Sequence, residues 1–327
     1  MAGHVARTVA QYLLVLFAAI SLNFALPRLA PGDAVDYLLP PEQAGSLTPE
    51  QRTQVLSQFG LDEPLATQFG DYLSGLARGD LLFSVRYGRP VTELLAERVG
   101  WSALLVGGAV LLSTVIGAVL GFRSAWRRGT SHDAGTLTGV MLVDSLPPFF
   151  VGMVLILVFS VQLDLFPIFG ALPTVDTSGP ALVGEVIRRS VLPLVTLTLA
   201  YIGPVYLVAR SALVSELQED YVLMAEAKGL SDRQVRRHAE RNALLPLSTV
   251  TLIGLGALVG GAAVVETVFS YPGLGRLIYE AVLARDYPVL QGAFLLLAIG
   301  VILANFVNDL LYPLLDPRVR RPRAATA

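Results

Sequence analysis

Apolar residues along the chain gather into six long runs separated by polar segments. Each run is near the roughly 20 residues that a helix needs to cross a bilayer. Since lipid offers the backbone no hydrogen-bond partners, such a segment is helical. The runs are Val9 to Leu26, Trp101 to Phe122, Thr136 to Val161, Val191 to Ala212, Leu244 to Val268 and Leu290 to Tyr312. The pattern predicts an all-α, polytopic membrane protein with six transmembrane helices, and residues 1–327 are interpreted as a single domain.

The basic residues predict the orientation of these spans. If the N-terminus is inside, the cytoplasmic segments hold Arg7, Arg123, Arg127, Arg128, the basic residues from Arg210 to Arg241, and Arg318, Arg320, Arg321 and Arg323. This placement follows the tendency of lysine and arginine to stay on the cytoplasmic side. We therefore expect both termini in the cytoplasm and an extracytoplasmic insert at 29–100. The first run exceeds the apolar part of a secretory signal, so we expect an uncleaved anchor.

Two patterns predict that the insert at 29–100 is folded. Thr48, followed by Pro-Glu-Gln, resembles a helix start, and further along Leu73, Leu76 and Ala77 follow helical spacing. We expect helices at both places.

One long, highly charged segment, Asp220 to Pro246, stands between two apolar runs. Ser215 and Ser231 each begin a capping-box pattern, in which Ser caps the helix and a Gln three residues later reaches back. Gly229 stands where the first helix needs a left-handed residue to end. The segment therefore predicts two helices joined at a sharp corner.

Both of these helices are predicted to be amphipathic. On the first, one face is shared by Leu217, Tyr221, Met224 and Ala225; on the second, Arg233, Arg237 and Arg241 recur opposite Val235, Ala239 and Asn242. The arginines alone are compatible with contacts to lipid headgroups. A headgroup cluster needs no capped corner, so we prefer a docking element for another protein.

Composition narrows the class of function. The chain is 54% hydrophobic and 15% charged, against about 25% charged for soluble domains. A net charge of -2 with dispersed basic residues argues against a nucleic-acid partner. Without cysteine, disulfides and thiolate metal sites are excluded. The single lysine, Lys228, lies between Ala227 and Gly229, so the chain has no P-loop, and any ATP must be hydrolysed by another subunit.

The sequence gives no support for an enzyme. His4, His132 and His238 have no partner at metal-ligand spacing, and no serine stands in a nucleophile motif. We expect neither a catalytic residue, nor a bound cofactor, nor a metal.

Asp144 is the main candidate for a polar group within the apolar runs. It shortly precedes Pro147 and Pro148, and ionisable residues inside a span usually face a cavity or a partner. The alternative, which we prefer, is that Asp144 lies near a helix break, where backbone amides freed by the proline pair satisfy its carboxylate. Asp309, near the end of the last run, is likewise interpreted as structural.

Small residues and amides supply the other candidates for a translocation path. Two small-xxx-small pairs, Gly117 with Gly121 and Gly256 with Gly260, allow helices to approach closely. Close packing and a pore wall of small residues are both compatible with this spacing. The candidate path residues are Asp144, Gly256, Gly260 and Asn305.

The charged segment resembles a known family. Ala225 to Ser231, Arg237 with His238, and Arg241 to Pro246 are similar to the cytoplasmic loop of the dipeptide, oligopeptide and nickel permeases of ABC importers. Further family signatures follow in the expected order: Pro31 to Asp33, Leu61 to Leu65, Gly79 to Leu81, Pro90 with Val91, Glu266 to Gly275, Arg285 to Pro288, Asn308 to Tyr312 and Asp316 to Arg318. The resemblance covers essentially the whole chain.

The chain departs from this family at four positions. Leu223 and Met224 stand where basic and small residues are usual, Glu226 replaces an arginine, and Leu82 replaces a glycine.

The resemblance implies a permease subunit in the plasma (inner) membrane. Its partners would be the lipid bilayer, a second homologous permease, two ABC ATPase subunits and an extracytoplasmic solute-binding protein. The loop 213–246, between the fourth and fifth spans, would be the coupling element that docks in a groove of the ATPase. The implied coupling residues are Tyr221, Ala225, Ala227, Lys228, Gly229, Leu230, Arg233, Arg237, Arg241, Asn242 and Pro246. The solute stays open among peptides, nickel chelates, haem and other small solutes.

Two other classes compete with this interpretation. A secondary transporter usually has more spans in one chain, with coupling-ion carboxylates near the middle of the membrane, and only Asp144 points that way. A membrane-embedded enzyme needs a cluster of catalytic residues within the spans, and the sequence shows none.

Overall fold

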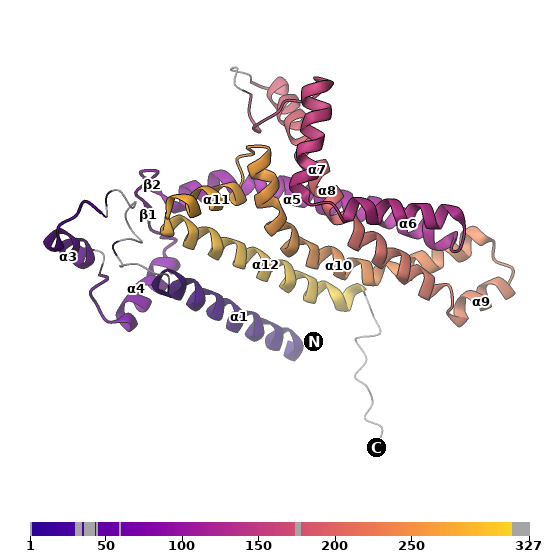
Figure 1. Cartoon of the computed structure of the whole chain (residues 1–327). Helices are drawn as coiled ribbons and strands as arrows, with labels where there is room; N and C mark the ends of the chain where they lie inside the picture. The colour runs from indigo at the N-terminus through magenta and orange to yellow at the C-terminus, as the bar shows by residue number, and fades with distance from the viewer. Residues whose placement is uncertain are drawn as a thin grey trace. The chain divides into compact units, whose positions relative to one another are not determined.

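The computed structural model of the chain is built almost entirely of helices (Figure 1). It describes residues 2–29, 35, 43, 45–58, 60–173 and 178–315. The helices are α1 (Ala2–Leu29), α3 (Pro49–Gln58), α4 (Leu65–Ala77), α5 (Val91–Trp126), α6 (Ser131–Asp144), α7 (Pro148–Leu155), the π-helical η2 (Ile156–Gln162), α8 (Pro180–Glu216), α9 (Asp220–Ala227), α10 (Asp232–Val268), α11 (Leu274–Ala284) and α12 (Tyr287–Leu315). The signatures at Pro31 to Asp33 and Asp316 to Arg318, and the arginines beyond 315, lie outside the described residues.

Two short strands, β1 (Phe83–Ser84) and β2 (Arg89–Pro90), form an antiparallel pair in which Phe83 lies opposite Pro90. The chain divides into two compact units. Unit 1 holds residues 1–102 and 272–303, and unit 2 holds residues 103–271 and 304–327. Because the boundaries fall within α5 and α12, these two helices contribute to both units.

Unit 1 has an apolar core around the start of α5. Its buried members come from α5, α11 and α12: Val91, Leu94, Leu95, Leu274, Leu277, Ala281, Val289 and Ala293. A Cβ atom at Gly292 would lie 2.6 Å from Val91 Cγ1, so α12 and α5 approach closely here. Beside this core, Ser84 Oγ donates a hydrogen bond of 2.5 Å to buried Asp286 Oδ2, which ties β1 to the start of α12.

The two helices predicted after the first apolar run lie in unit 1. α3 begins at Pro49 with a reciprocal cap, in which Gln51 N donates to Thr48 Oγ1 at 3.3 Å and Thr48 N donates to Gln51 Oε1 at 2.8 Å. Leu73, Leu76 and Ala77 lie on α4. Both predicted helices are therefore confirmed.

Unit 2 is held together by close helix packing around α8. A Cβ atom at Gly117 of α5 would lie 2.7 Å from Val205 Cγ1, and one at Gly121 would lie 2.7 Å from the Tyr206 carbonyl oxygen. The close packing predicted for this glycine pair is confirmed. Buried residues of α8 fill the interface, and the hydroxyls of Thr114 and Thr251, 3.2 Å apart, join α5 to α10.

The candidate membrane spans differ in part from those predicted. Within the described residues, four helices are long and apolar enough to cross a bilayer: α1, α5, α8 and α12. α6 with α7 and η2 makes a fifth crossing if this bent pair counts as one span. The predicted run Leu244 to Val268 lies inside α10, which passes through Pro246 without interruption. α5 begins at Val91, ten residues before the predicted start at Trp101.

The third predicted span is not a straight helix. Instead of one helix from Thr136 to Val161, α6 ends at Asp144, and α7 leaves at 95°. Pro147 has extended backbone angles (φ -59°, ψ 138°), and Pro148 occupies the first helical position of α7. A residue before proline is driven away from the helical region, whereas proline suits a helix start, so the Pro-Pro pair places the break here. Hydropathy alone does not register such a bend.

Candidate functional site

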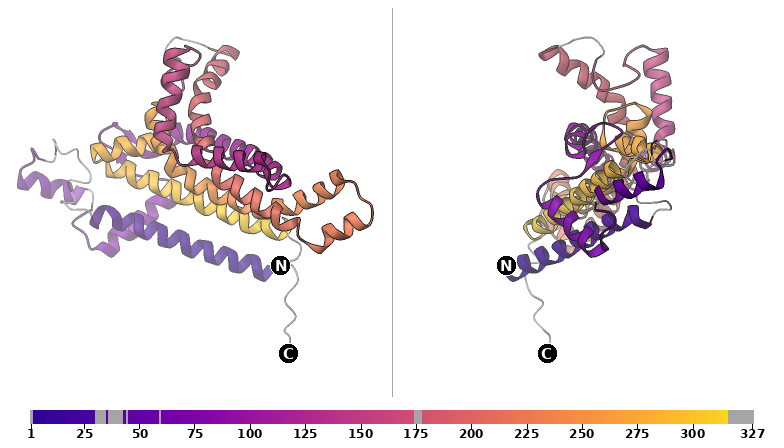
Figure 2. Two further views of the ribbon diagram at one scale, coloured as in Figure 1. Left: turned by 45° about the vertical axis from the view of Figure 1, so that its right-hand side comes forward. Right: turned by 90° about the vertical axis from the view of Figure 1, so that its left-hand side faces the viewer.

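The charged segment forms a hairpin of two helices at one end of α8, visible at the right of Figure 1 and in the left view of Figure 2. α9 ends in a left-handed glycine, since Gly229 has a φ of +77°. Leu230 N donates to the Ala225 carbonyl at 3.2 Å and Gly229 N donates to the Glu226 carbonyl at 2.9 Å. These two bonds are those of a Schellman motif. The predicted left-handed helix ending at Gly229 is confirmed.

Of the two predicted capping boxes, one forms. Ser231 caps α10, and the reciprocal bonds between Ser231 and Gln234 are both present. The box predicted at Ser215 is wrong, because α8 continues through Ser215 to Glu216 and α9 begins only at Asp220. A capping pattern starts a helix only where the preceding helix has ended.

The amphipathic character of the start of α10 is confirmed. Val235, Ala239 and Ala243 are buried, at a spacing of four residues, whereas the predicted arginines Arg233, Arg237 and Arg241 are exposed. Pro246, the last residue of the predicted loop, is also exposed and lies within α10. The second helix of the loop is therefore continuous with the predicted fifth span.

The predicted inner face of α9 is only partly correct. Tyr221 and Ala225 are half-buried, but Met224 is 59% exposed, and the buried residue is Val222. Leu223 beside it is 69% exposed. Ala227 and Lys228 are exposed at the end of the helix. α9 therefore presents two large apolar side chains at its surface.

Tyr221 fastens α9 to the end of α8. Its hydroxyl donates a hydrogen bond of 2.6 Å to Glu216 Oε2. Burial, reinforced by this bond, raises the pKa of Tyr221 to about 12, and a hydrogen bond with Asn242 of α10 opposes the rise. The phenol is therefore protonated at neutral pH and joins three helices.

Arg236 is a linking residue that the sequence patterns did not single out. It pairs with Glu240 at 2.6 Å, and its guanidinium lies 5.8 Å from the centroid of the Trp126 ring at the end of α5. A cation at this distance is attracted to the face of the indole. The start of α10 is thereby connected to the end of α5.

A second glycine corner, between α5 and α6, was also missed by sequence reasoning. Gly129 has a φ of +81°, and Thr130 caps α6 by accepting from Asp133 N. The Asp133 carboxylate is buried and receives two bonds from Arg210 of α8, at 2.8 and 2.7 Å. The Thr-x-x-Asp spacing of a helix start was the available signal, but the pairing with Arg210 is a long-range contact.

Two hydroxyls complete this buried network. Ser124 donates to Asp133 Oδ1, and its oxygen lies 2.7 Å from the Tyr206 hydroxyl. Gly129 N donates to Asp133 Oδ2 at 3.1 Å. The network therefore joins the end of α5, the start of α6 and the C-terminal part of α8.

The structure does not show the interaction that we preferred for Asp144, in which freed backbone amides donate to its carboxylate. The amides of Ser145 and Leu146, next along the chain, donate to the carbonyls of Met141 and Val143 instead. Asp144 is exposed in the isolated chain, and its carboxyl packs against Gly203 of α8, where a Cβ atom would collide with it. The carboxylate thus remains accessible at the bend between α6 and α7.

The other path candidates are distributed over different helices. Asn305 is half-buried on α12. Gly256 and Gly260 lie on α10, but their surroundings fall outside the described part of the chain. The described contacts of Asp144 are with α8 and do not gather these candidates into one site.

Comparison with known proteins identifies related sequences along the whole chain. The family model described as "binding-protein-dependent transport system inner membrane component" matches residues 102–321. The di/tripeptide transport system permease protein DppB of Pseudomonas aeruginosa is 36% identical over 341 residues, covering 99% of this chain and 100% of the relative. The dipeptide transport system permease protein DppB of Escherichia coli K12 is 36% identical, covering 92% and 94%.

One solved structure has a similar fold. It is an inward facing conformation of the MetNI methionine ABC transporter, with a TM-score of 0.55. The sequence identity is 20%, and the match covers 68% of this chain and 96% of the other. At this identity the similarity concerns the fold alone.

Proposed function

Because the chain belongs to the family of binding-protein-dependent transport system inner membrane components, we propose that it is the permease subunit of an ABC importer for small peptides. With a second homologous permease it forms the translocation path. Two separate ATPase subunits supply the energy, and an extracytoplasmic solute-binding protein delivers the solute. Peptides are the proposed solutes because both DppB relatives are named for di- or tripeptide transport.

The observation that carries the coupling mechanism is the corner between α9 and α10. It combines a Schellman ending, a reciprocal cap and an exposed surface of Leu223, Met224 and three arginines. Each side of the corner is attached to a long helix. α9 is hydrogen-bonded to the end of α8, and α10 continues into the predicted fifth span. A push on the corner by a closing ATPase therefore rotates α10 as a rigid body. The coupling residues are those from Tyr221 to Pro246 given above.

Orientation and span number are part of the proposal. The chain crosses the plasma membrane six times as one permease domain, with α10 as the fifth span and the bent α6–α7 pair as the third. Both termini and the loop 213–246 are cytoplasmic, and the insert 29–100 is extracytoplasmic. Reporters fused after Arg128 and inserted near Ser46 test this topology. They should report opposite sides of the membrane, and finding Arg128 outside would refute it.

Asp144 is proposed to line the path, together with Asn305, Gly256 and Gly260. Its support is the exposed carboxylate at a bend inside an apolar region, a location that is costly without a functional partner. A peptide's α-amino group is the proposed partner. Asp144→Asn should then weaken peptide uptake while leaving ATPase capture intact.

Reconstitution tests the proposed function. Proteoliposomes that contain this chain, the second permease and both ATPases should take up labelled dipeptide only with ATP and the binding protein. The chain alone should hydrolyse no ATP. Uptake driven by a proton gradient without ATPases would identify a secondary transporter instead.

A further inference from the structure

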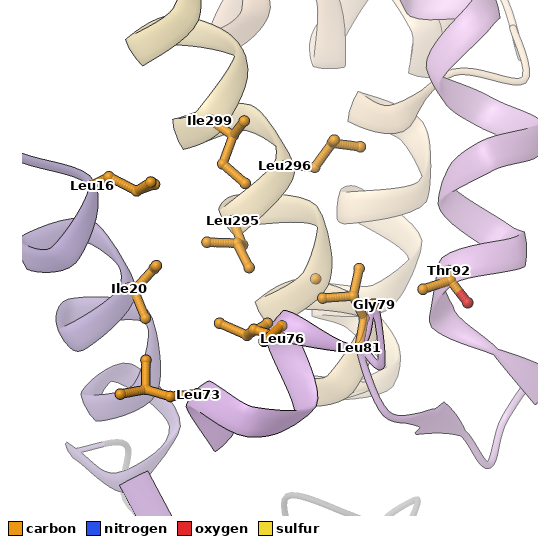
Figure 3. Close-up of a pocket in the computed structure, with 12 residues that line it drawn as sticks. Leu16, Ile20, Leu73, Leu76, Gly79, Leu81, Thr92, Leu295, Leu296 and Ile299 are labelled. Carbon is orange, nitrogen blue, oxygen red and sulfur yellow. The ribbon is translucent and has the colours of Figure 1, made fainter. Parts of the chain in front are cut away.

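Unit 1 contains an apolar groove of about 460 Å³ between α1, α4, the start of α5 and α12. Figure 3 shows Leu16 and Ile20 of α1 on one side, Leu295 and Ile299 of α12 across from them, and α4 with Leu76 at one end. Among the twelve lining residues, Thr92 carries the one polar side chain. The groove therefore suits a hydrocarbon ligand.

The groove runs along helices that are able to cross a bilayer. Its lining on α12 extends from Gly292 to Ile299, which is about 10 Å at 1.5 Å per residue. One leaflet of hydrocarbon is about 15 Å thick. Since α1 and α12 are candidate spans, the groove covers much of the depth of one leaflet and is parallel to the lipid tails.

The α4 end of the groove has the features of a membrane–water interface. The ring of Phe24 lies 5.1 Å from Phe69 and 5.5 Å from Tyr72, and the Tyr72 hydroxyl accepts a hydrogen bond from Asn23. Tyrosine, with an apolar ring and a polar hydroxyl, is enriched at the level of the lipid headgroups. The exposed Arg78 follows directly after α4, between two residues that line the groove. Its guanidinium donates to the carbonyl and hydroxyl oxygens of Ser74 on α4, at 3.1 and 2.9 Å, so a cation lies beside the α4 end of the groove.

We propose that this groove binds one acyl chain of an anionic membrane phospholipid, with the phosphate at Arg78. A peptide is a poor occupant, because its backbone would find almost no hydrogen-bond partner there. A chain of methylenes needs no such partner. The bound lipid fastens α1 and α4 to α12, so it is a structural ligand of unit 1.

Native mass spectrometry of the full-length chain in detergent tests the proposal, with palmitoyl-oleoyl phosphatidylglycerol and phosphatidylethanolamine as competing probes. We expect one phosphatidylglycerol retained per chain. Leu16→Trp, which fills the groove, should abolish the lipid adduct. Leu14→Trp is the matched control, because Leu14 is on the same helix, does not line the groove and is 70% exposed; it should keep the adduct.

A second pair of variants tests the headgroup. Arg78→Gln should keep a bound lipid but lose the preference for phosphatidylglycerol, whereas Arg86→Gln, an exposed arginine outside the groove, should retain it. The proposal is overturned if the wild-type chain retains no lipid or if both tryptophan variants behave alike. It is also overturned if the lipid disappears on assembly with the second permease, since the groove would then be a subunit interface.

Discussion

Two corners of unit 2 use the same local chemistry in different surroundings. The α5–α6 corner (residues 126–133) and the α9–α10 corner (residues 227–235) each turn at a glycine of positive φ and then begin a capped helix. Around the first, buried Asp133 binds Arg210 of α8. Around the second, the neighbouring arginines and two large apolar side chains are exposed.

This difference indicates that the first corner stabilises the interior of the protein, whereas the second exposes its surface to a partner protein. The first corner uses its charge inside the protein, where a bidentate pair fixes three helices. The second corner is held by its own caps, by Tyr221 and by Arg236 against Trp126, and its outer surface remains exposed. Identical turn chemistry therefore does not indicate identical function. The contacts that surround each turn distinguish the two functions.

The largest expected effect is at the α5–α6 corner. Arg210→Ala leaves the Asp133 carboxylate buried at 5% exposure without its main partner, and breaking such a pair typically costs about 3–5 kcal/mol. Thermal unfolding in detergent should show a large loss of stability. Arg237→Ala at the exposed α9–α10 corner should change it little. Similar losses for both variants would remove the distinction between the corners.

Substituting valine for each of the two corner glycines distinguishes an effect on stability from an effect on coupling to the ATPase. Gly229→Val and Gly129→Val both force a branched residue to positive φ, at a cost of about 1–3 kcal/mol each. A Cβ atom added at either glycine would meet no other atom within 4 Å, so steric collisions do not distinguish them. Both variants should unfold at similarly lowered temperatures. Only Gly229→Val should lose ATPase capture in pull-down and peptide uptake; equal losses would contradict the account.

Removal of the helix caps should have a smaller effect. Ser231→Ala and Thr130→Ala each remove a side-chain cap, which is worth about 1 kcal/mol. We expect similar small decreases in thermal stability, with ATPase capture weakened for Ser231→Ala alone. Weaker capture by Thr130→Ala would assign docking to both corners.

Tyr221→Phe should have the smallest effect, because it removes one hydrogen bond of a half-buried phenol and leaves both helix caps in place. Since burial raises the pKa of Tyr221 to about 12, from an ordinary value near 10, the protonated phenol favours the folded state. Its contribution is complete below about pH 10 and is lost as the pH rises towards 12. The stability difference between wild type and Tyr221→Phe should shrink over that interval, and a constant difference would contradict this assignment.

The sequence predicted features that depend on neighbouring residues. Gly229 and the Ser231 cap were correct because the bonds that define them lie within six residues. The box at Ser215 failed because packing keeps α8 helical through it. Asp133 was missed because its partner is 77 residues away. The proline pair correctly predicted a helix break near Asp144, but the 95° bend was not predicted, because an apolar run has the same hydropathy whether straight or bent.

A cross-linking measurement tests the central claim, that the α9–α10 corner docks on the ATPase. The chain has no cysteine, so Met224→Cys introduces a single thiol on the exposed surface of α9, and Arg128→Cys does the same at the α5–α6 corner. In membranes that contain the complete transporter, a short thiol–amine cross-linker should join Met224→Cys to the ATPase and leave Arg128→Cys unlinked. A linked Arg128→Cys together with an unlinked Met224→Cys would contradict the account.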